Sequence, residues 1–274
     1  MSDLTWLRAY LKARSGLDLP STKRYLAESR LGPLWRDAGL GSLAELVGRL
    51  RASDNTPLHR AVVEAMTTNE TSFFRDRPAF DALRTIVLPR LIEARSGRRR
   101  LAVWSAAAST GQEAYSVAML LADMAPALAG WTVSILATDI SPAVIGRART
   151  GTYSQLEVQR GLPIGLLLRH FEQGPDGWTI SPELRRTVDF RVLNLLDDTR
   201  RLGRFDLILC RNLLIYLDAR TKAEVIAKLS AALVPDGVLC LGATESLMGY
   251  APAMAPDPAA PGFVVHRMPE RLAS

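Results

Sequence analysis

From about residue 100 onward, short apolar runs alternate with segments in which apolar residues recur every three or four positions. The first pattern is typical of buried strands and the second of helices. Strands that alternate with helices predict a mostly parallel sheet that is covered by helices. The predicted strands lie near 101–105, 132–138, 188–193, 205–210, 237–242 and 262–267, and the predicted helices near 112–124, 141–149, 164–171 and 219–233.

The first 66 residues show only the helical spacing, as in Leu43, Leu46, Val47 and Leu50. Glycine and proline residues divide this stretch into short helices. A change of pattern therefore separates two domains. The predicted parts are an all-helical N-terminal domain (1–66), a linker followed by one helix (67–95) and a sheet domain (96–274).

Two segments interrupt the alternation of strands and helices in the sheet domain. One further helix is predicted ahead of the first strand. Gly174-Pro175-Asp176-Gly177 is a strong turn signal, which predicts a small antiparallel hairpin inserted in the sheet domain near 172–187. Residues 251–262 are rich in proline and alanine and predict a loop. Pro78 is expected to open a helix that continues to about Glu93.

Composition narrows the class of protein. The chain is 48% hydrophobic but contains no apolar run of about 18 residues, so no membrane insertion is expected. Its first residues lack the basic segment followed by an apolar segment that is typical of a secretory signal peptide, which favours a cytoplasmic protein. Cys210 and Cys240 lie in apolar runs and are expected to be buried thiols. The three histidines lie far apart, with no Cys or acidic cluster at ligand spacing, so no metal site is expected.

The net charge of +6 leaves two classes of partner open. A basic surface attracts nucleic acid, and it attracts an acidic protein equally well. Many of the basic residues fall within the first 51 positions, where they form either an ordinary solvated surface or a docking face for an acidic helical partner. The run from Arg98 to Arg100 is interpreted as a solvated link into the first strand.

The strongest chemical signal is the stretch from Trp104 to Ser116, which predicts a strand, a loop of small residues and a helix. Small residues let the backbone approach a ligand, and a helix start offers unpaired N–H groups. The next strand ends in Asp139, where doubly wound folds hold a ribose. A nucleoside-containing cofactor is therefore predicted, although a capping box with Thr110 could explain Glu113, and a turn or helix cap could explain Asp139.

Polar residues also follow other predicted strands. Arg211 and Asn212 end one buried strand and Asn194 ends another, whereas Tyr216 could be plain core. The linker segment, residues 67–76, contains a possible capping box of its own, Thr67 with Glu70. No structural role accounts for the remaining polar residues of this segment, Asn69, Thr71 and Arg75.

Five motifs together resemble the CheR family, the chemotaxis receptor protein-glutamate O-methyltransferases. They are Thr-x-Asn-x-Thr-x-Phe-Phe-Arg (67–75), Trp-Ser-Ala-Ala-x-Ser-Thr-Gly-x-Glu-x-Tyr-Ser (104–116), Ala-Thr-Asp-Ile-Ser (137–141), Leu-Asn-Leu (193–195) and Phe-Asp-x-Ile-x-Cys-Arg-Asn-x-Leu-Ile-Tyr (205–216). The resemblance implies an α/β fold, a doubly wound methyltransferase-like sheet with a small inserted hairpin, preceded by an all-α domain. It also implies S-adenosylmethionine as cofactor, S-adenosylhomocysteine as product and chemoreceptor glutamates as substrate.

The same resemblance assigns roles to individual residues. The implied cofactor contacts are Asn69, Thr71 and Arg75 in the linker segment, Glu113, Asp139 at the ribose, Asn194 with Leu195, and Arg211 with Asn212; Arg75 and Tyr216 are the implied catalytic pair beside the transferred methyl.

Two departures from the family pattern bear on partners. Gln112 and Ala114 replace the usual Glu and Pro, but the second Glu of the motif is kept at position 113. The hairpin turn is shorter than in members that tether to a receptor's C-terminal peptide, so no tether is expected. The implied partner is the cytoplasmic helical region of chemoreceptors, and the protein is expected to be a monomer.

Two other functions compete with this interpretation. A nucleic-acid methyltransferase would carry Asn/Asp-Pro-Pro-Tyr/Phe where this chain has Arg211-Asn212-Leu213-Leu214, so nucleic acid is not the expected substrate. A cofactor-sensing module without catalysis would not need Arg75, Asp139, Asn212 and Tyr216 together.

Overall fold

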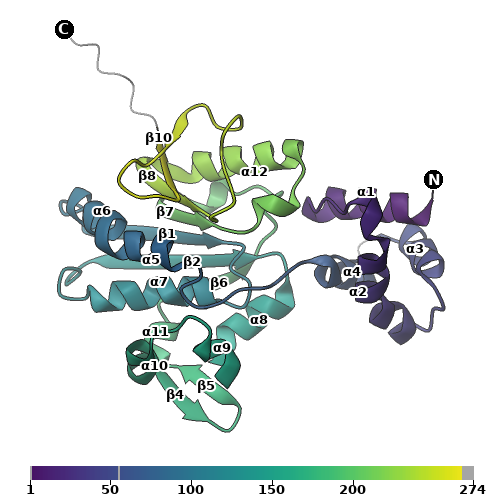
Figure 1. Ribbon diagram of the computed structural model, residues 1–274, viewed down its shortest axis with the longest axis horizontal. Helices are drawn as coiled ribbons and strands as arrows, with labels where there is room; N and C mark the ends of the chain where they lie inside the picture. Colours follow the sequence, from purple (N-terminus) through teal and green to yellow (C-terminus); the bar gives the residue numbers. More distant parts are fainter. Residues whose placement is uncertain (1, 55, 267–274) are drawn as a thin grey trace. The chain divides into compact units, whose positions relative to one another are not determined.

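The computed structural model describes residues 2–54 and 56–266 of the 274-residue chain. The chain divides into two compact units (Figure 1). The helical unit comprises Met1–Thr68 and Tyr216–Lys222, and the sheet unit comprises Asn69–Ile215 and Ala223–Ser274. Each unit has a hydrophobic core of its own.

The helical unit packs its amphipathic helices around Leu7, Leu11, Leu31 and Leu46, all of which are fully buried. Ser42 caps one helix by accepting a hydrogen bond from the Glu45 N–H. The helices are α1 (Asp3–Ser15), α2 (Arg24–Asp37), α3 (Leu43–Arg51) and α4 (Pro57–Met66), with a 3₁₀ turn at Ser21–Lys23.

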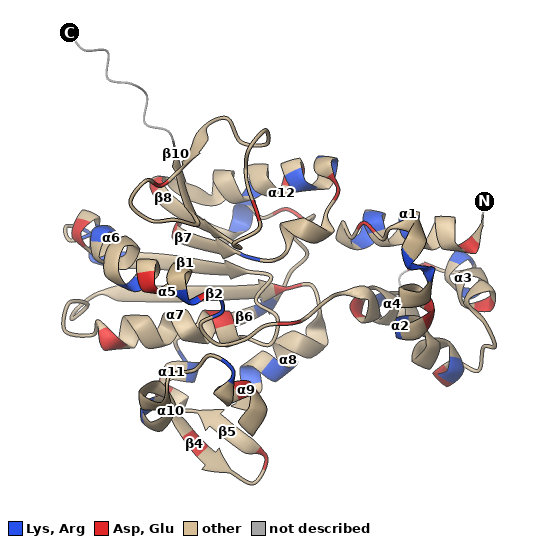
Figure 2. Cartoon of the chain, viewed as in Figure 1, with Lys and Arg blue, Asp and Glu red and all other residues tan. Residues whose placement is uncertain are grey.

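A returning segment completes the helical unit. The Asp18 N–H donates to the Tyr216 carbonyl at 2.9 Å, and Lys12 forms an ion pair with Asp218. Basic and acidic residues, coloured blue and red in Figure 2, both occur along these helices. Arg30 donates to the carbonyls of Met66 and Thr67 at 2.9 and 3.0 Å. Lys12 and Arg30, like Arg14, Arg24 and Arg51, therefore have partners inside the unit, and a docking role for its basic residues stays a prediction.

The main sheet has seven strands in the order β6-β2-β1-β7-β8-β10-β9. The first five are parallel, whereas β10 pairs antiparallel with β8 and with β9. The predicted, mostly parallel sheet is thus confirmed. The strands are β1 (Arg100–Ala106), β2 (Thr132–Asp139), β6 (Val188–Val192), β7 (Phe205–Cys210), β8 (Leu233–Leu241), β9 (Met254–Pro256) and β10 (Phe263–His266).

Helices lie on both sides of this sheet, for example α7 (Gln112–Asp123) below and α12 (Ala219–Ala232) above in the view of Figure 1. Helix α8 (Pro142–Thr150) follows β2. The helix that was predicted from Pro78 onward begins at Arg77 and widens in its middle. It consists of α5 (Arg77–Ala82), a π-helical stretch (Leu83–Val87) and α6 (Leu88–Ala94). Pro89, which lacks an N–H donor, follows the widened turn and accounts for the broken α-helical pattern.

A small antiparallel sheet, β3-β5-β4, is inserted between α8 and β6. The turn at Gly174 and Gly177 forms as predicted, but a third strand joins the hairpin. That strand has only two residues, too few to produce an apolar pattern. The insertion contains β3 (Thr152–Tyr153), α9 (Gln155–Gln159), α10 (Ile164–His170), β4 (Phe171–Gly174), β5 (Gly177–Ile180) and α11 (Pro182–Arg185).

Two further predictions were wrong: that residues 251–262 form a loop throughout, and that Arg98 is only a solvated link into the first strand. The expected loop at 251–262 contains β9, which ends in Pro256 and lies at the edge, where a missing N–H is tolerated. Arg98 is not simply a solvated link, because it pairs with the buried carboxylate of Asp206 in β7. Arg98 can reach Asp206 because β7 pairs with β1, and the local sequence does not reveal this pairing.

Both cysteines are buried as expected, and burial raises the pKa of both thiols, that of Cys240 to about 12. Within the described ranges, no helix is long and apolar enough to span a bilayer. In the same ranges, no cluster of three or more His, Cys, Asp or Glu side chains is arranged to hold a metal ion.

Candidate active site

The predicted site residues of the sheet unit follow the carboxyl ends of neighbouring strands. From β1 the chain moves through α7 to β2 on one side, whereas β7 lies on the other side of β1. This reversal is the topological switch point at which α/β sheets bind ligands. Glu113, Asp139 and Arg211 come after or at the ends of β1, β2 and β7, respectively.

The loop between β1 and α7 is held in an unusual conformation. Ala107, Ser109 and Gly111 have positive φ angles of 61°, 51° and 94°. A Cβ atom at Gly111 would lie 3.0 Å from Ala148 Cβ, so a side chain would not fit. Gly111 is also the N-cap of α7, which begins at Gln112, and no side chain caps this helix. The suggested capping box is therefore wrong, because the Thr110 hydroxyl donates to the Gln112 side chain instead.

Glu113 is consequently available for a site role. Its carboxylate accepts from the Ser105 hydroxyl at 2.8 Å and from Arg211 Nη1 at 3.3 Å. Burial raises the pKa of Glu113, and the charge of Arg211 opposes this effect. A buried carboxylate between a hydroxyl and a guanidinium is suited to bind a cationic group.

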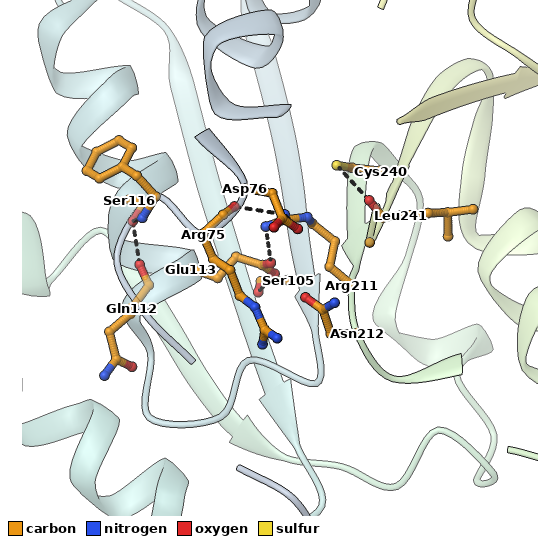
Figure 3. A network of polar contacts seen from close by, with 12 residues as sticks. Arg75, Asp76, Ser105, Gln112, Glu113, Ser116, Arg211, Asn212, Cys240 and Leu241 are labelled. Atoms are coloured by element: carbon orange, nitrogen blue, oxygen red, sulfur yellow. Dashed lines mark hydrogen bonds and ion pairs between the residues drawn. The ribbon is translucent and has the colours of Figure 1, made fainter. Parts of the chain in front are cut away.

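Arg211 connects the linker segment to this carboxylate (Figure 3). Its Nη2 donates to Asp76 at 2.7 Å and to the Arg75 carbonyl at 2.8 Å, and its guanidinium lies 5.4 Å from the ring centre of Phe80. Its Nε is buried and has no hydrogen-bond partner among the described residues. The expected direct contact of Arg211 with the adenosine stays a prediction. The structure adds a connecting role that the sequence did not suggest.

From Asn69 onward the linker segment belongs to the sheet unit, and hydrogen bonds fix it to other parts of that unit at several points. The Ser109 hydroxyl donates to the Asn69 carbonyl at 2.7 Å, and the Phe74 N–H donates to the Ser116 hydroxyl at 3.0 Å. Arg75 Nη1 donates to the Glu70 carbonyl at 2.9 Å. Asp76 adopts a φ angle of 60°, a conformation that is uncommon outside glycine. These contacts hold the backbone around Arg75 in one conformation.

The capping box proposed for this segment, Thr67 with Glu70, is also wrong. No helix begins there: Thr67 ends α4, and its hydroxyl donates to the Glu64 carbonyl. The Glu70 carboxylate instead pairs with Arg160 at 2.6 Å.

Asp139 is buried and organises two loops. Its Oδ2 accepts from the Ser109 N–H at 2.9 Å and its Oδ1 from the Ser141 N–H at 3.0 Å. The helix cap of α8 is Ser141, so the cap alternative for Asp139 is wrong and the turn alternative is correct. The part that Asp139 plays in this turn does not test its implied contact with the ribose, which stays a prediction.

The remaining predicted contacts lie after β6 and β7. The Asn194 side chain accepts from the Leu196 N–H at 3.0 Å, and the Leu195 carbonyl accepts from Lys228 Nζ at 3.2 Å. Asn212 has a φ angle of 59°, and its N–H donates to Glu245 Oε2 at 2.8 Å. Tyr216 belongs to the helical unit, so its pairing with Arg75 stays a prediction.

Sequence reasoning missed Ser105, Asp76 and Glu245, which contact the predicted site residues Glu113, Arg211 and Asn212, respectively. Asp76 directly follows Arg75, and Glu245 lies four residues after the end of β8, so the rule used for other strand ends would have found Glu245. Asp76 and Glu245 also border a cavity of about 720 Å³ whose walls include Leu247, Met254 and Phe263.

The residues present fit a nucleoside cofactor with a charged end. Glu113 and Asp139 are acceptors suited to an ammonium group and to ribose hydroxyls, and Arg211 Nε is a buried donor that a bound group can satisfy. The sheet order with its antiparallel strand β10, together with Glu113 in the first turn of α7 and Asp139 at the end of β2, fits the class of S-adenosylmethionine-dependent methyltransferases.

Comparison with known families and proteins is more specific. The sequence matches "CheR methyltransferase, SAM binding domain" over residues 69–255 and "CheR methyltransferase, all-alpha domain" over residues 2–67. The chain therefore belongs to the CheR methyltransferase family. This confirms the resemblance and the S-adenosylmethionine-binding domain that it implied.

Similar curated proteins are chemotaxis protein methyltransferases. "Chemotaxis protein methyltransferase 1" of Pseudomonas aeruginosa is 42% identical over 250 residues, which is 90% of each chain. "Chemotaxis protein methyltransferase Cher2" of Pseudomonas putida is 41% identical over 90% of this chain and 91% of that protein. The relative from Vibrio parahaemolyticus is 40% identical over 88% and 87% of the two chains.

Proposed function

We propose that this enzyme transfers the methyl group of S-adenosylmethionine to glutamate side chains in the cytoplasmic helical region of bacterial chemoreceptors, forming glutamyl methyl esters. The observation that carries the proposal is the match to chemotaxis protein methyltransferases along nine-tenths of both chains. The buried Glu113 network supports it, because it offers a binding place for a cationic cofactor. The reaction would take place in the cytoplasm.

The chemistry requires little beyond positioning. When bound, S-adenosylmethionine supplies an electrophilic methyl group on a sulfonium and leaves as S-adenosylhomocysteine. A glutamate carboxylate, with a reference pKa of about 4.3, is already ionised at neutral pH, so no general base is needed. This agrees with the absence of histidine from all five family motifs.

Arg75 is proposed to orient the incoming carboxylate. One of its nitrogens already donates to the Glu70 carbonyl, which restricts where the other donors can point. Charge-assisted hydrogen bonds from those donors would align the carboxylate for attack. We propose that the hydroxyl of Tyr216 donates to the same carboxylate or to the cofactor, while Glu113 holds the cofactor's ammonium group and Asp139 its ribose.

The proposed function is tested by incubating the purified protein with methyl-labelled S-adenosylmethionine and chemoreceptor cytoplasmic fragments. Base-labile label that is released as methanol from the receptor is the expected result, because only a methyl ester behaves in this way. Receptor fragments whose candidate glutamates are replaced by glutamine are the matched control. Binding of the cofactor without any labelled receptor would contradict the proposal and favour a sensing module.

Two variants separate the proposed roles. Arg75→Ala is expected to lower turnover by about 10²-fold while the cofactor Kd stays within about threefold, since Arg75 would act mainly on the aligned carboxylate. Asp139→Ala is expected to weaken cofactor binding first. Wild-type turnover in Arg75→Ala would remove Arg75 from the catalytic step.

We also propose that the enzyme acts as a monomer and needs no receptor tether. The turn between β4 and β5 contains only Pro175 and Asp176. Titration of the receptor's C-terminal peptide is expected to give no measurable binding, and micromolar binding would contradict the prediction.

A further inference from the structure

Glu245 lies in the loop that follows β8 and binds three backbone N–H groups. Its Oε2 accepts from Asn212 and Gly242, each at 2.8 Å, and its Oε1 accepts from Leu214 at 2.6 Å. Two of the donors belong to the loop after β7 and one follows β8. One carboxylate therefore holds the ends of two adjacent strands together.

These bonds constrain the backbone on both sides of Asn212. Asn212 has a φ angle of 59°, a conformation that L-residues other than asparagine and aspartate seldom adopt. Its own N–H and that of Leu214 both point to the same carboxylate. Hydrogen bonds to a charged acceptor are stronger than neutral ones, so they favour this conformation over the extended alternatives.

Gly242 completes the arrangement. A Cβ atom at this position would lie 2.7 Å from Glu245 Oε2 and 2.9 Å from both the N and the Nδ2 of Asn212. The side chain of Asn212 thus lies against the bare backbone of Gly242. Any larger residue at 242 would displace either the carboxylate or the asparagine.

We propose that Glu245 is a positioning residue for the cofactor site and acts through Asn212. This inference rests on the proposed function and on the cofactor contact that the family resemblance implies for Asn212. Glu245 itself holds the loop in the conformation that presents the Asn212 side chain.

The test is a double-mutant cycle on the affinity for S-adenosylhomocysteine, measured by calorimetry. The variants are Glu245→Gln, Asn212→Ala and the pair together. A glutamine places an NH₂ group against backbone donors, so Glu245→Gln is expected to raise the Kd at least about tenfold. If Glu245 acts through Asn212, adding Asn212→Ala to Glu245→Gln raises the Kd little further. If the Kd of the double variant instead rises by the product of the two single-variant factors, the inference is overturned.

Asp257→Asn is the matched control. Asp257 lies between β9 and β10, and its carboxylate also accepts a backbone N–H, that of Ala259 at 3.0 Å, and pairs with Arg90 at 2.5 Å. It has no contact with Asn212 among its hydrogen bonds in the described ranges. A similar loss of Tm in both variants, with the Kd changed only in Glu245→Gln, supports a positioning role. An equal change of Kd in both would overturn it.

Gly242→Ala tests the same contact with the carboxylate intact, in case Glu245→Gln does not fold. It is expected to raise the Kd, and an unchanged Kd would overturn the inference. An unchanged Kd in Asn212→Ala alone would remove the premise and overturn the inference as well. The proposed function would survive that result, since the labelling of the receptor decides it separately.

Discussion

Strand β7 has an arginine–carboxylate cluster at each end, and the two clusters are built differently. At its start, the buried Asp206 accepts from Arg95 Nε at 2.6 Å, from the Ala102 N–H at 2.8 Å and from Arg98. The two terminal nitrogens of Arg95 pair with the two oxygens of Asp236. All three nitrogens of Arg95 therefore have carboxylate partners.

The cluster after the other end of β7 is less complete. Arg211 binds Asp76 and Glu113, but its buried Nε has no partner among the described residues. Glu113 carries a raised pKa because burial disfavours its charge. Left-handed backbone conformations occur beside both clusters, here at Asp76 and Asn212 and at the other end at Arg99.

The difference indicates which cluster serves stability and which serves binding. Saturated hydrogen bonds satisfy the charge of Asp206 within the protein, so a ligand would gain nothing there. An unpartnered donor and a costly buried charge are features that cluster at functional sites. The same strand thus joins a structural cluster to a candidate binding cluster.

Breaking the structural cluster is expected to have the largest effect. Asp206→Ala removes the carboxylate that Arg95 Nε binds and leaves this buried nitrogen without a partner. The substitution should lower the free energy of unfolding by about 3–5 kcal/mol. Urea denaturation measures this loss, and cofactor affinity should be retained in the folded fraction. Asp198→Ala, which removes the exposed pair with Arg200, is the control and should change stability very little. Equal losses in both variants would contradict the distinction.

Glu113→Gln tests the binding cluster. Loss of its charge should weaken S-adenosylhomocysteine binding by about 10- to 100-fold, or about 1.5–3 kcal/mol, with little loss of stability. Glu157→Gln is a matched control, because Glu157 also binds a serine and an arginine, Ser154 and Arg147, but in helix α9 of the insertion. Calorimetry should find its affinity unchanged, and a weakened control would point to a general effect of lost carboxylates.

Ser105→Ala should have a smaller effect on the same contact. The hydroxyl donates to Glu113 Oε1 at 2.8 Å, and its loss should weaken cofactor binding by about three- to tenfold. Ser154→Ala removes the corresponding serine–glutamate bond at Glu157 and should leave the affinity as it was. Identical affinities in the two serine variants would show that Ser105 does not support Glu113.

The two clusters should also respond oppositely to pH, as the smallest effect. Because the folded-state pKa of Glu113 is raised, its contribution to stability is complete below the unfolded pKa and is lost as pH rises through the folded pKa. The hydrogen bond from Arg95 lowers the pKa of Asp236, so this contribution is present above the unfolded pKa and is lost as pH falls. Denaturation at a series of pH values should show Glu113→Gln removing the loss of stability that accompanies rising pH and Asp236→Asn removing the loss that accompanies falling pH. Unchanged profiles would contradict both assignments.

Much of the fold followed from local pattern, because buried strands and amphipathic helices differ in period. The strands of the main sheet that were missed or shortened lie where this signal fails. Strand β9 has three residues and ends in proline, and β8 begins at Leu233, ahead of the polar Asp236. Both proposed capping boxes, at Thr67 and Thr110, were wrong because neither threonine is the residue before a helix. A short motif does not reveal whether a helix begins at that residue.

What the sequence alone determined is the set of polar residues at strand ends, since the carboxyl ends of parallel strands share one edge of a sheet. Motif order also identified the family. Only the tertiary structure decided which of these residues touch. Arg211 meets Glu113 across 98 positions and Asp76 across 135, because β7 lies next to β1 in the sheet. Strand order depends on packing of the whole sheet, which local periodicity does not encode.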